Sequence, residues 1–311
     1  MEFVPVSGRD MPRFAGLKTF FRLPAAPIDE AYDVGICGVP YDGGVSYRPG
    51  ARFAPTKVRE ISALGRGYHW TRGVNWTETL KVADIGDVPV VPVNGEETYR
   101  RIEAFFDKVM AADKKVLAVG GGHDCTLAIL RSIAKKHGPV NMVHFDAHLD
   151  TYPAAWGQEY HHGAFMRHAI EEGLVNPRRT LQIGIRGPLA AGSDLDFVRV
   201  QEVTVTTVDD IRIGGLEAFL EKLPSFADGK TYISFDVDCL DPAFAPGTGT
   251  PVPGGLTSYE VQRILRALDI GDLVAGDVVE VSPPYDVSDL TALIAVDVLF
   301  EMLVQMAVRK P

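Results

Sequence analysis

Short runs of consecutive apolar residues alternate along the chain with longer segments in which apolar residues recur every three or four positions. Runs of about four to eight apolar residues are typical of strands buried on both faces, and the longer period is typical of helices that bury one side. The runs predict strands at residues 32–39, 116–119, 140–145, 180–185, 203–208, 231–236 and 274–281. This order predicts an α/β fold with a mainly parallel sheet that helices cover on both faces.

Helices are predicted between these strands, and several of their ends carry clear signals. Asn94 and Glu97 have the spacing of a capping box, and Gly138 follows the last residue of another helical segment. The predicted helices cover residues 55–64, 94–112, 123–137, 163–172, 209–223 and 288–308, with a further helix from 257 onward.

The alternation continues through the chain without a linker-like change of composition or an internal repeat. Residues 1–311 are therefore interpreted as a single domain. Residues 1–30 are broken by prolines and show no period, so they are predicted to form an extended N-terminal arm that either packs on a neighbouring subunit or is mobile.

Polar side chains follow the predicted strand at 140–145. Asp146, His148 and Asp150 alternate, so in extended backbone they point to the same side. No Lys or Arg lies between them, and the two carboxylates would repel each other without a positive partner. A divalent metal ion is the simplest such partner, and the alternative is a solvated acidic loop with a chance histidine.

Two other strand ends carry the same kind of side chain. His123 follows the strand at 116–119, and Asp236 and Asp238 close the β-rich run at 231–238. Because the carboxyl ends of parallel strands meet at one edge of a sheet, these side chains are expected to converge with the first group. The combined set has four carboxylates and two imidazoles, which suits two divalent ions and favours manganese over zinc, with nickel or cobalt as alternatives.

The composition narrows the possible partners and the compartment. The net charge of −10 disfavours nucleic acid and would attract a cationic small molecule. No segment is expected to span a membrane, and the first thirty residues lack the order of a secretory signal. The three cysteines, Cys37, Cys125 and Cys239, are interpreted as buried thiols of a cytoplasmic protein.

Four motifs occur in one order: GGGHD, FDAHLD, SFDVDCLDPAFAPGTGTPVPGGLT and VVEVSPPYD. With them the chain resembles the ureohydrolases, the arginase and agmatinase family, over nearly everything from Gly38 to the C-terminus. The loop at 241–255 and the segment YDGGVSYRPGARFAP are more similar to agmatinases than to arginases. The resemblance implies a three-layer αβα sandwich, two manganese ions and a homo-oligomer, either a trimer or a hexamer.

The resemblance also implies roles for the residues at the strand ends. One metal ion would be bound by His123 and Asp150, and the other by His148 and Asp238. Asp146 and Asp236 would each bind both ions. Asp150 would also accept a hydrogen bond from the attacking water.

Two further residues match the family outside the metal ligands. Glu280 matches the guanidinium-binding glutamate, with a structural ion pair to an arginine as the alternative. His162, in a His-Gly pair, is the candidate general acid, although His161 lies beside it. His144 matches a position just outside the ligand set.

The implied reaction is hydrolysis of a guanidino compound to urea and an amine, with agmatine as the leading substrate. Arginine is less favoured, because the loop TYPAAWGQEY after Asp150 shows little resemblance to the arginase loop. Other guanidino acids, a biguanide and formiminoglutamate are the alternatives, and bulky Trp156 indicates a pocket shaped differently from that of a typical agmatinase.

Two rival interpretations lie outside this reaction. A non-catalytic partner subunit would be expected to have lost metal ligands, and all six are present. A deacetylase-like hydrolase would hold a single zinc ion and would lack the paired Asp236 and Asp238.

One departure from the family pattern occurs beside the first ligand histidine. Ureohydrolases usually carry an aspartate immediately before it and a serine immediately after it. This chain has Gly122 before His123 and Asp124 after it. A glycine at the preceding position is similar to the formiminoglutamase branch, so the departure is expected to affect substrate choice more than metal binding.

Overall fold

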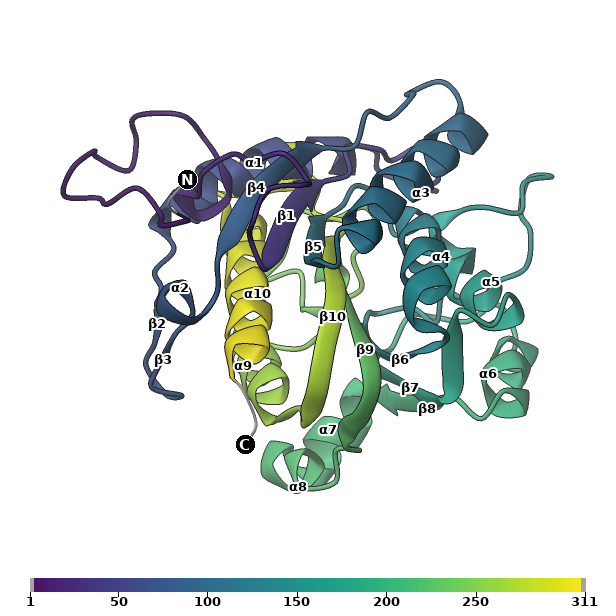
Figure 1. The fold of residues 1–311 in the computed structure, drawn as a ribbon. Helices are drawn as coiled ribbons and strands as arrows, with labels where there is room; N and C mark the ends of the chain where they lie inside the picture. Colours follow the sequence, from purple (N-terminus) through teal and green to yellow (C-terminus); the bar gives the residue numbers. More distant parts are fainter. Residues whose placement is uncertain (1–2, 309–311) are drawn as a thin grey trace.

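An eight-stranded parallel sheet forms the centre of the computed structural model, which describes residues 3–308 (Figure 1). Its strands lie in the order β4-β1-β5-β10-β9-β6-β7-β8, and every neighbouring pair is parallel. They are β1 (Val34–Gly38), β4 (Val82–Asp87), β5 (Lys115–Val119), β6 (Val140–Phe145), β7 (Val175–Ile185), β8 (Thr204–Thr207), β9 (Phe226–Asp236) and β10 (Ile270–Val279). All carboxyl ends therefore lie along one edge of the sheet.

Helices cover both faces of this sheet, which confirms the predicted three-layer α/β architecture (Figure 1). One face carries α3 (Gly95–Ala111), α4 (Cys125–His137) and α5 (Phe165–Glu171). The other carries α1 (Ala54–Ile61), α7 (Val208–Gly214), α8 (Leu216–Leu220), α9 (Ser258–Ala267) and α10 (Leu290–Ala307). The smaller elements are β2 (Tyr68–His69), β3 (Val74–Asn75), α2 (Trp76–Thr79) and α6 (Asp196–Val200).

The carboxyl-terminal halves of the central strands β9 and β10 are buried, because helices pack on both faces of the sheet. Every residue of β1 and β6 is buried, and two hydrophobic cores lie on opposite sides of the sheet. By length and composition alone α10 could cross a membrane, contrary to the expectation from the sequence. It packs against β10, α1 and α9, and 67% of it is buried, so its apolar composition is explained by its place in the core.

Local signals set most of the helix ends. The side chain of Asn94 accepts a hydrogen bond from the Glu97 N–H at 3.0 Å, and Gly138 ends α4 with φ 75°. The predicted single helix at 209–223 is wrong. Gly215 adopts φ 83°, a left-handed conformation that interrupts the helix and separates α7 from α8.

Part of the predicted N-terminal arm contributes to the core of its own chain. Phe20, Phe21 and Leu23 are buried on the α1 side of the sheet, and Ala25 forms a bridge with Asp84 of β4. The interpretation of residues 1–311 as a single domain stays a prediction.

Candidate active site and metal centre

Four adjacent strands, β5, β10, β9 and β6, deliver the predicted site residues to one place at the carboxyl edge of the sheet. All of these side chains are buried except that of His148, which is 22% exposed. They are His123 after β5, Glu280 after β10, Asp236 and Asp238 at the end of β9, and Asp146, His148 and Asp150 after β6.

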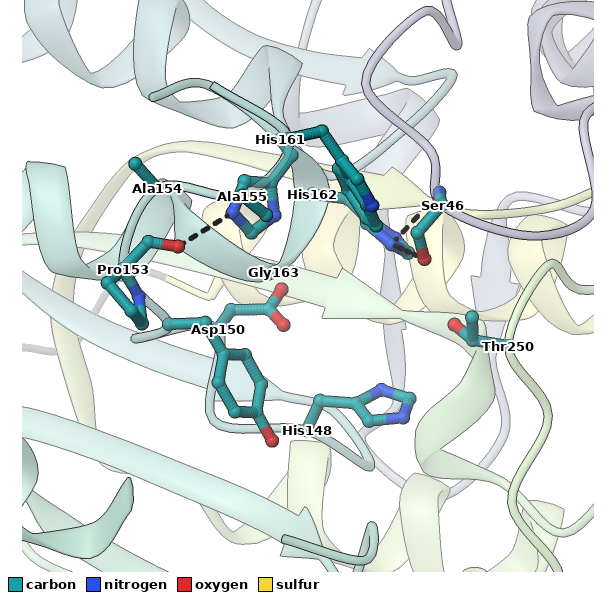
Figure 2. Close-up of a pocket in the computed structure, with 12 residues that line it drawn as sticks. Ser46, His148, Asp150, Pro153, Ala154, Ala155, His161, His162, Gly163 and Thr250 are labelled. Atoms are coloured by element: carbon teal, nitrogen blue, oxygen red, sulfur yellow. Dashed lines mark hydrogen bonds between the residues drawn. The ribbon is translucent and has the colours of Figure 1, made fainter. Parts of the chain in front are cut away.

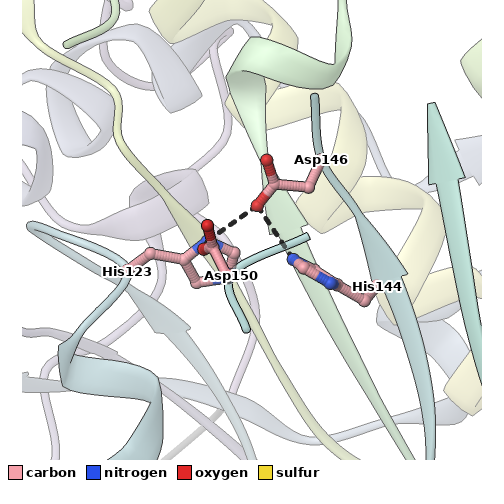
Figure 3. Close-up of side chains that lie close together, drawn as sticks. All are labelled: His123, His144, Asp146 and Asp150. Atoms are coloured by element: carbon pink, nitrogen blue, oxygen red, sulfur yellow. Dashed lines mark hydrogen bonds and ion pairs between the residues drawn. The ribbon is translucent and has the colours of Figure 1, made fainter. Parts of the chain in front are cut away.

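The first cluster is centred on the Nδ1 atom of His123 (Figure 3). This nitrogen lies 3.1 Å from an oxygen of Asp146 and 3.1 Å from an oxygen of Asp150. An oxygen of Asp236 lies 3.2 Å away. Nδ1 is buried and makes no hydrogen bond, so none of the three carboxylates accepts a proton from it in good geometry. Separations of about 3 Å are those of neighbouring ligands around an octahedral cation with ligands at about 2.1 Å. The ligand atoms of His123, Asp146 and Asp150, with that of His144, all lie within 4.8 Å of one another, so this group could hold one divalent ion, and Asp236 borders it.

The second cluster lies on the other side of Asp146. The Nδ1 atom of His148 is 3.1 Å from Asp238 Oδ2 and 3.3 Å from Asp146 Oδ1. Asp146 therefore presents one oxygen to each cluster, as expected for a ligand shared by two ions. Asp236 contacts the first cluster, while its other oxygen accepts the Asp238 N–H at 2.8 Å, so its binding to both ions stays a prediction.

The buried carboxylates outnumber the imidazoles that face them. Burial, with the charges of Asp238 and Asp146, raises the pKa of Asp236 well above its usual range. Burial and the Asp146 charge also raise the pKa of Asp150. Divalent cations at these positions would stabilise the ionised carboxylates and would offset the effect of burial and of their mutual repulsion.

His144 lies close to the first cluster but uses both ring nitrogens elsewhere. The Gln182 side-chain amide donates to the Leu149 carbonyl at 2.8 Å and to His144 Nδ1 at 2.9 Å. Nε2 of His144 therefore carries the proton and donates it to Asp146 Oδ2 at 2.9 Å. His144 thus orients a ligand carboxylate, which agrees with its interpretation as a residue outside the ligand set.

The outer nitrogen of His123 is fixed by a network that the sequence did not suggest. Nε2 lies 2.8 Å from the Ser234 hydroxyl, which donates to Asp277 at 2.7 Å. Asp277 is fully buried and also accepts hydrogen bonds from Thr126 and Tyr232, each at 2.7 Å. With Nε2 engaged in this way, Nδ1 of His123 presents its lone pair to the first cluster.

Glu280 and His162 lie together beside the first cluster. Glu280 Oε1 accepts the His123 N–H at 2.9 Å and lies 3.2 Å from His162 Nδ1, whereas Oε2 is buried without a partner. Burial alone would lower the pKa of His162, but the hydrogen bond and charge of Glu280 raise it to about 9. Nε2 of His162 lies 2.6 Å from the Ser46 hydroxyl (Figure 2).

The two alternatives considered for these residues are not seen in the structure. Glu280 has no arginine partner within residues 3–308. His161 contacts the Pro153 carbonyl at 3.1 Å and therefore supports the loop, whereas its neighbour His162 contacts Glu280.

Three of the predicted site residues have backbone in the left-handed region. Their φ angles are 52° for Asp150, 53° for Trp156 and 61° for Glu280. Such residues cost roughly 1–3 kcal/mol each and persist only where the surrounding structure holds them, often at functional sites. In this chain the left-handed turn directs Asp150 and Glu280 towards the clusters.

A cavity of about 420 Å³ opens beside the second cluster (Figure 2). Its wall includes His148, Asp150 and His162, and Trp156, which is 75% exposed, lies at the outer part. Three hydroxyl-bearing residues that were not predicted as site residues, Ser46, Tyr152 and Thr250, also line the cavity.

Ser46 lies in the segment YDGGVSYRPGARFAP, whose resemblance to agmatinases was the only signal for it. Asp42 folds this loop back by accepting the Gly50 N–H at 2.7 Å and pairing with Arg52. Ser46 is thereby brought to the cavity and to His162.

The departure at Gly122 and Asp124 has a steric cause. Asp124 is buried and accepts a hydrogen bond from the Tyr99 hydroxyl at 3.0 Å, and burial together with the Glu280 charge raises its pKa to about 7. A Cβ atom at position 122 would lie 2.5 Å from Asp124 Oδ1. The two substitutions are therefore coupled, since Asp124 in this position requires glycine at 122.

Comparison with known proteins agrees with this geometry. The model of the arginase family matches residues 32–304. The chain is 47% identical to guanidinopropionase from Pseudomonas aeruginosa, with 97% of this chain and 96% of that protein covered. It is 41% identical to mitochondrial agmatinase from Gallus gallus, with 96% and 88% covered.

The fold of the chain also resembles that of a solved structure. Proclavaminate amidinohydrolase from Streptomyces clavuligerus superposes with a TM-score of 0.88 at 41% identity, over 95% of this chain and 99% of that one. The chain therefore belongs to the arginase family of ureohydrolases, and its two His/Asp clusters form the metal-binding centre typical of that family.

Proposed function

We propose that the chain hydrolyses a guanidino acid to urea and an amino acid, with two manganese ions held by the two clusters. The observation that carries this proposal is the unpaired, buried Oε2 of Glu280 next to paired His/Asp clusters. A metal centre beside a carboxylate that lacks a cation suits a positively charged substrate group.

Glu280 supplies the negative charge for the guanidinium group. A carboxylate oxygen without a partner can accept N–H donors from the planar guanidinium in a charge-assisted hydrogen bond. A Cβ atom at position 249 would lie 3.2 Å from Oε2, so Gly249 leaves room for the substrate there.

The reaction adds a water oxygen to the guanidinium carbon and breaks the bond from that carbon to the alkyl nitrogen. Two divalent ions at the clusters would supply a water that loses its proton near neutral pH. Asp150, on the cavity wall, is placed to accept a hydrogen bond from that water and orient it. The departing nitrogen must gain a proton, and His162, with a pKa raised to about 9, carries one at neutral pH.

The lining of the cavity favours an acidic over an ammonium tail. Apart from Asp150, none of the described lining residues carries a carboxylate. The hydroxyls of Ser46 and Tyr152 can donate hydrogen bonds to a substrate carboxylate, whereas an ammonium group would find no second fixed negative charge. The higher identity to guanidinopropionase, 47% against 41% for agmatinase, supports the same choice.

Agmatine is the second candidate. Its support is the net charge of −10, which attracts a dication, and the 41% identity to an agmatinase. The two candidates differ only in the group at the far end of the substrate.

Urea release from 3-guanidinopropionate, 4-guanidinobutyrate, agmatine and arginine, measured with manganese and with nickel, tests the proposal. A guanidino acid should give the highest kcat/KM, with manganese as the more effective metal. A higher kcat/KM for agmatine would contradict the acidic substrate class. No urea from any of them, with two ions bound per chain, would contradict hydrolysis and favour a non-catalytic partner subunit.

We further propose that the protein works in the cytoplasm as a homotrimer or homohexamer. Its three cysteines are buried and free, and large apolar side chains such as Phe14 and Trp70 are 85% and 91% exposed. Sedimentation analysis of the purified protein should give three or six chains per particle, and a monomer would contradict the assembly.

A further inference from the structure

A second cavity, of about 660 Å³, is lined by residues next in sequence to those of the substrate cavity. Gly43 and Gly44, just before Ser46, line the second cavity, as do residues 157–160, which follow Trp156. The same two loops thus face the substrate on one side and this cavity on the other. Its side chains are mainly acidic and aromatic: Glu96, Asp124, Glu159, Tyr41, Tyr99 and Tyr160.

The inner part of the second cavity has a polar atom without a partner. Asp124 is 1% exposed; one carboxylate oxygen accepts the Tyr99 hydroxyl, and the other makes no hydrogen bond with any described residue. Tyr41, which is 7% exposed, lines the same cavity. Buried polar atoms are nearly always hydrogen-bonded, so the unpartnered oxygen of Asp124 points to a ligand that donates a hydrogen bond.

The charge of the cavity defines the ligand further. Three carboxylates line it, and no Lys, Arg or His among the described residues does so. Arg131 touches the ring of Tyr160, but it lies outside the lining and is already paired with Glu103 and Glu172. Because the pKa of Asp124 is raised to about 7, the negative charge available to a cationic ligand comes mainly from Glu96 and Glu159.

The aromatic walls suit an organic cation rather than a metal ion. The rings of Tyr99 and Tyr160 lie 5.3 Å apart at an angle of 32°. Tyrosine faces attract organic cations, and carboxylates bind their N–H groups. Among the described residues, none of the groups of side chains that could hold a metal ion includes Glu96, Asp124 or Glu159.

We propose that this second cavity binds a small primary ammonium compound, independently of the substrate. The ammonium group would lie between the carboxylates and the Tyr41 hydroxyl, with its carbon body against the tyrosine rings.

A ligand in the second cavity would contact the backbone segments that carry Ser46 and His162 into the substrate cavity. Gly44, which lines the second cavity, accepts the His162 N–H at 3.0 Å through its carbonyl. The loop at 157–160 leads directly to His161 and His162. This arrangement makes the second cavity suited to a regulatory ligand.

Calorimetric titration of the manganese-loaded enzyme with 4-fluorobenzylammonium chloride tests the proposal. The double variant Glu96→Gln/Glu159→Gln should weaken binding about four- to twenty-fivefold, because each exposed carboxylate contributes about two- to fivefold. Tyr41→Phe should weaken it about two- to tenfold, the effect of one hydrogen bond.

Two control variants distinguish binding in this cavity from a general charge effect and from binding in the substrate cavity. Glu217→Gln/Glu221→Gln on α8, on the opposite face of the sheet, changes the charge by the same amount and should leave binding unchanged. Trp156→Ala, in the wall of the substrate cavity, should also leave binding unchanged. Absence of binding by the parent enzyme, equal weakening in the α8 variant, or loss of binding only in Trp156→Ala would overturn the proposal.

Discussion

Glu280 divides its two carboxylate oxygens between two tasks. Oε1 accepts the backbone N–H of His123 and contacts His162, so it ties a metal-ligand segment to the candidate acid. Oε2 is buried and has no partner, so it is free for the substrate. The left-handed backbone at Glu280 makes this arrangement possible, and nothing in the local sequence indicates it.

Replacing Glu280 by glutamine tests this division at a single residue. The change keeps the shape but removes the charge, so a charge-assisted hydrogen bond of about 1.5–3 kcal/mol becomes a neutral one. We expect kcat/KM to fall by about one to two orders of magnitude with metal content unchanged. Urea release and bound metal should be measured on the same samples, and near-parental kcat/KM with full metal would remove Glu280 from the site.

The pair at positions 122 and 124 allows a double-mutant test. Gly122→Asp alone should destabilise the protein by about 1–3 kcal/mol, the usual range for overpacking, since its Cβ would lie 2.5 Å from Asp124 Oδ1. Gly122→Asp/Asp124→Ser, which restores the usual family residues, should recover most of that loss. Urea denaturation of the two variants measures this coupling, and additive effects would show that the positions are independent.

His162 provides a prediction about pH. Its pKa is raised from 6.5 to about 9, so its protonated form stabilises the folded protein fully below pH 6.5, and this stabilisation is lost as the pH rises through 9. We expect chelator-treated parent protein to lose on the order of 3 kcal/mol more than His162→Asn between pH 6.5 and 9.5. Denaturation at both pH values tests this, and equal losses in the two proteins would contradict the ion pair.

Several residues of the site could be predicted from the sequence, and others could not. Asp146, His148 and Asp150 were evident because alternation after a buried strand leaves few other interpretations. Asp277 was not, because it lies within an apolar strand and acquires its role only when β9 pairs with β10. Ser46 reaches His162 across 116 positions of the sequence, a contact that no local pattern contains.

At the scale of elements, strand register connects the metal centre to the core. β9 and β10 pair with Ser234 opposite Asp277, and β6 and β9 pair with His144 opposite Ser234. The register therefore places Ser234 between His123 and Asp277. A shift of one residue would turn these side chains to the other face of the sheet.

Ser234→Ala tests the importance of this register-dependent contact. Loss of the hydroxyl leaves Nε2 of His123 without its partner, and we expect affinity for the first metal ion to fall about 10- to 100-fold. Affinity at the His148 cluster should be unchanged. Thr126→Val is the matched control, because the Thr126 hydroxyl also donates to Asp277 but makes no hydrogen bond with the His123 ring. Equal metal affinity in both variants would contradict the role of Ser234.

β4 is an element that the sequence did not reveal, and the reason is physical. β4 was not predicted because its apolar run is interrupted by Asp84 and Gly86. Asp84 is nevertheless buried, since it pairs with Arg59 at 2.8 Å and accepts the Phe20 N–H at 3.0 Å. Its burial depends on partners far away in the sequence, which a local period does not include.

At the scale of the whole molecule, the parallel sheet brings segments that are far apart in the sequence to one edge. The strands that carry His123, Asp146 and Asp236 were recognisable because they are continuous apolar runs, and parallel order then required their ends to converge. The cavity wall is built from loops, which have no comparable rule. Substrate choice was therefore harder to predict from the sequence than the reaction.

We propose that these strand ends form one active site, which requires two divalent ions per chain. The most direct measurement is a titration of chelator-treated protein with manganese, following urea release and bound metal together. We expect no activity without metal and maximal activity at two ions per chain. In His148→Ala we expect one remaining ion and little activity. Maximal activity at one ion per chain, or full activity in the chelated protein, would contradict this proposal.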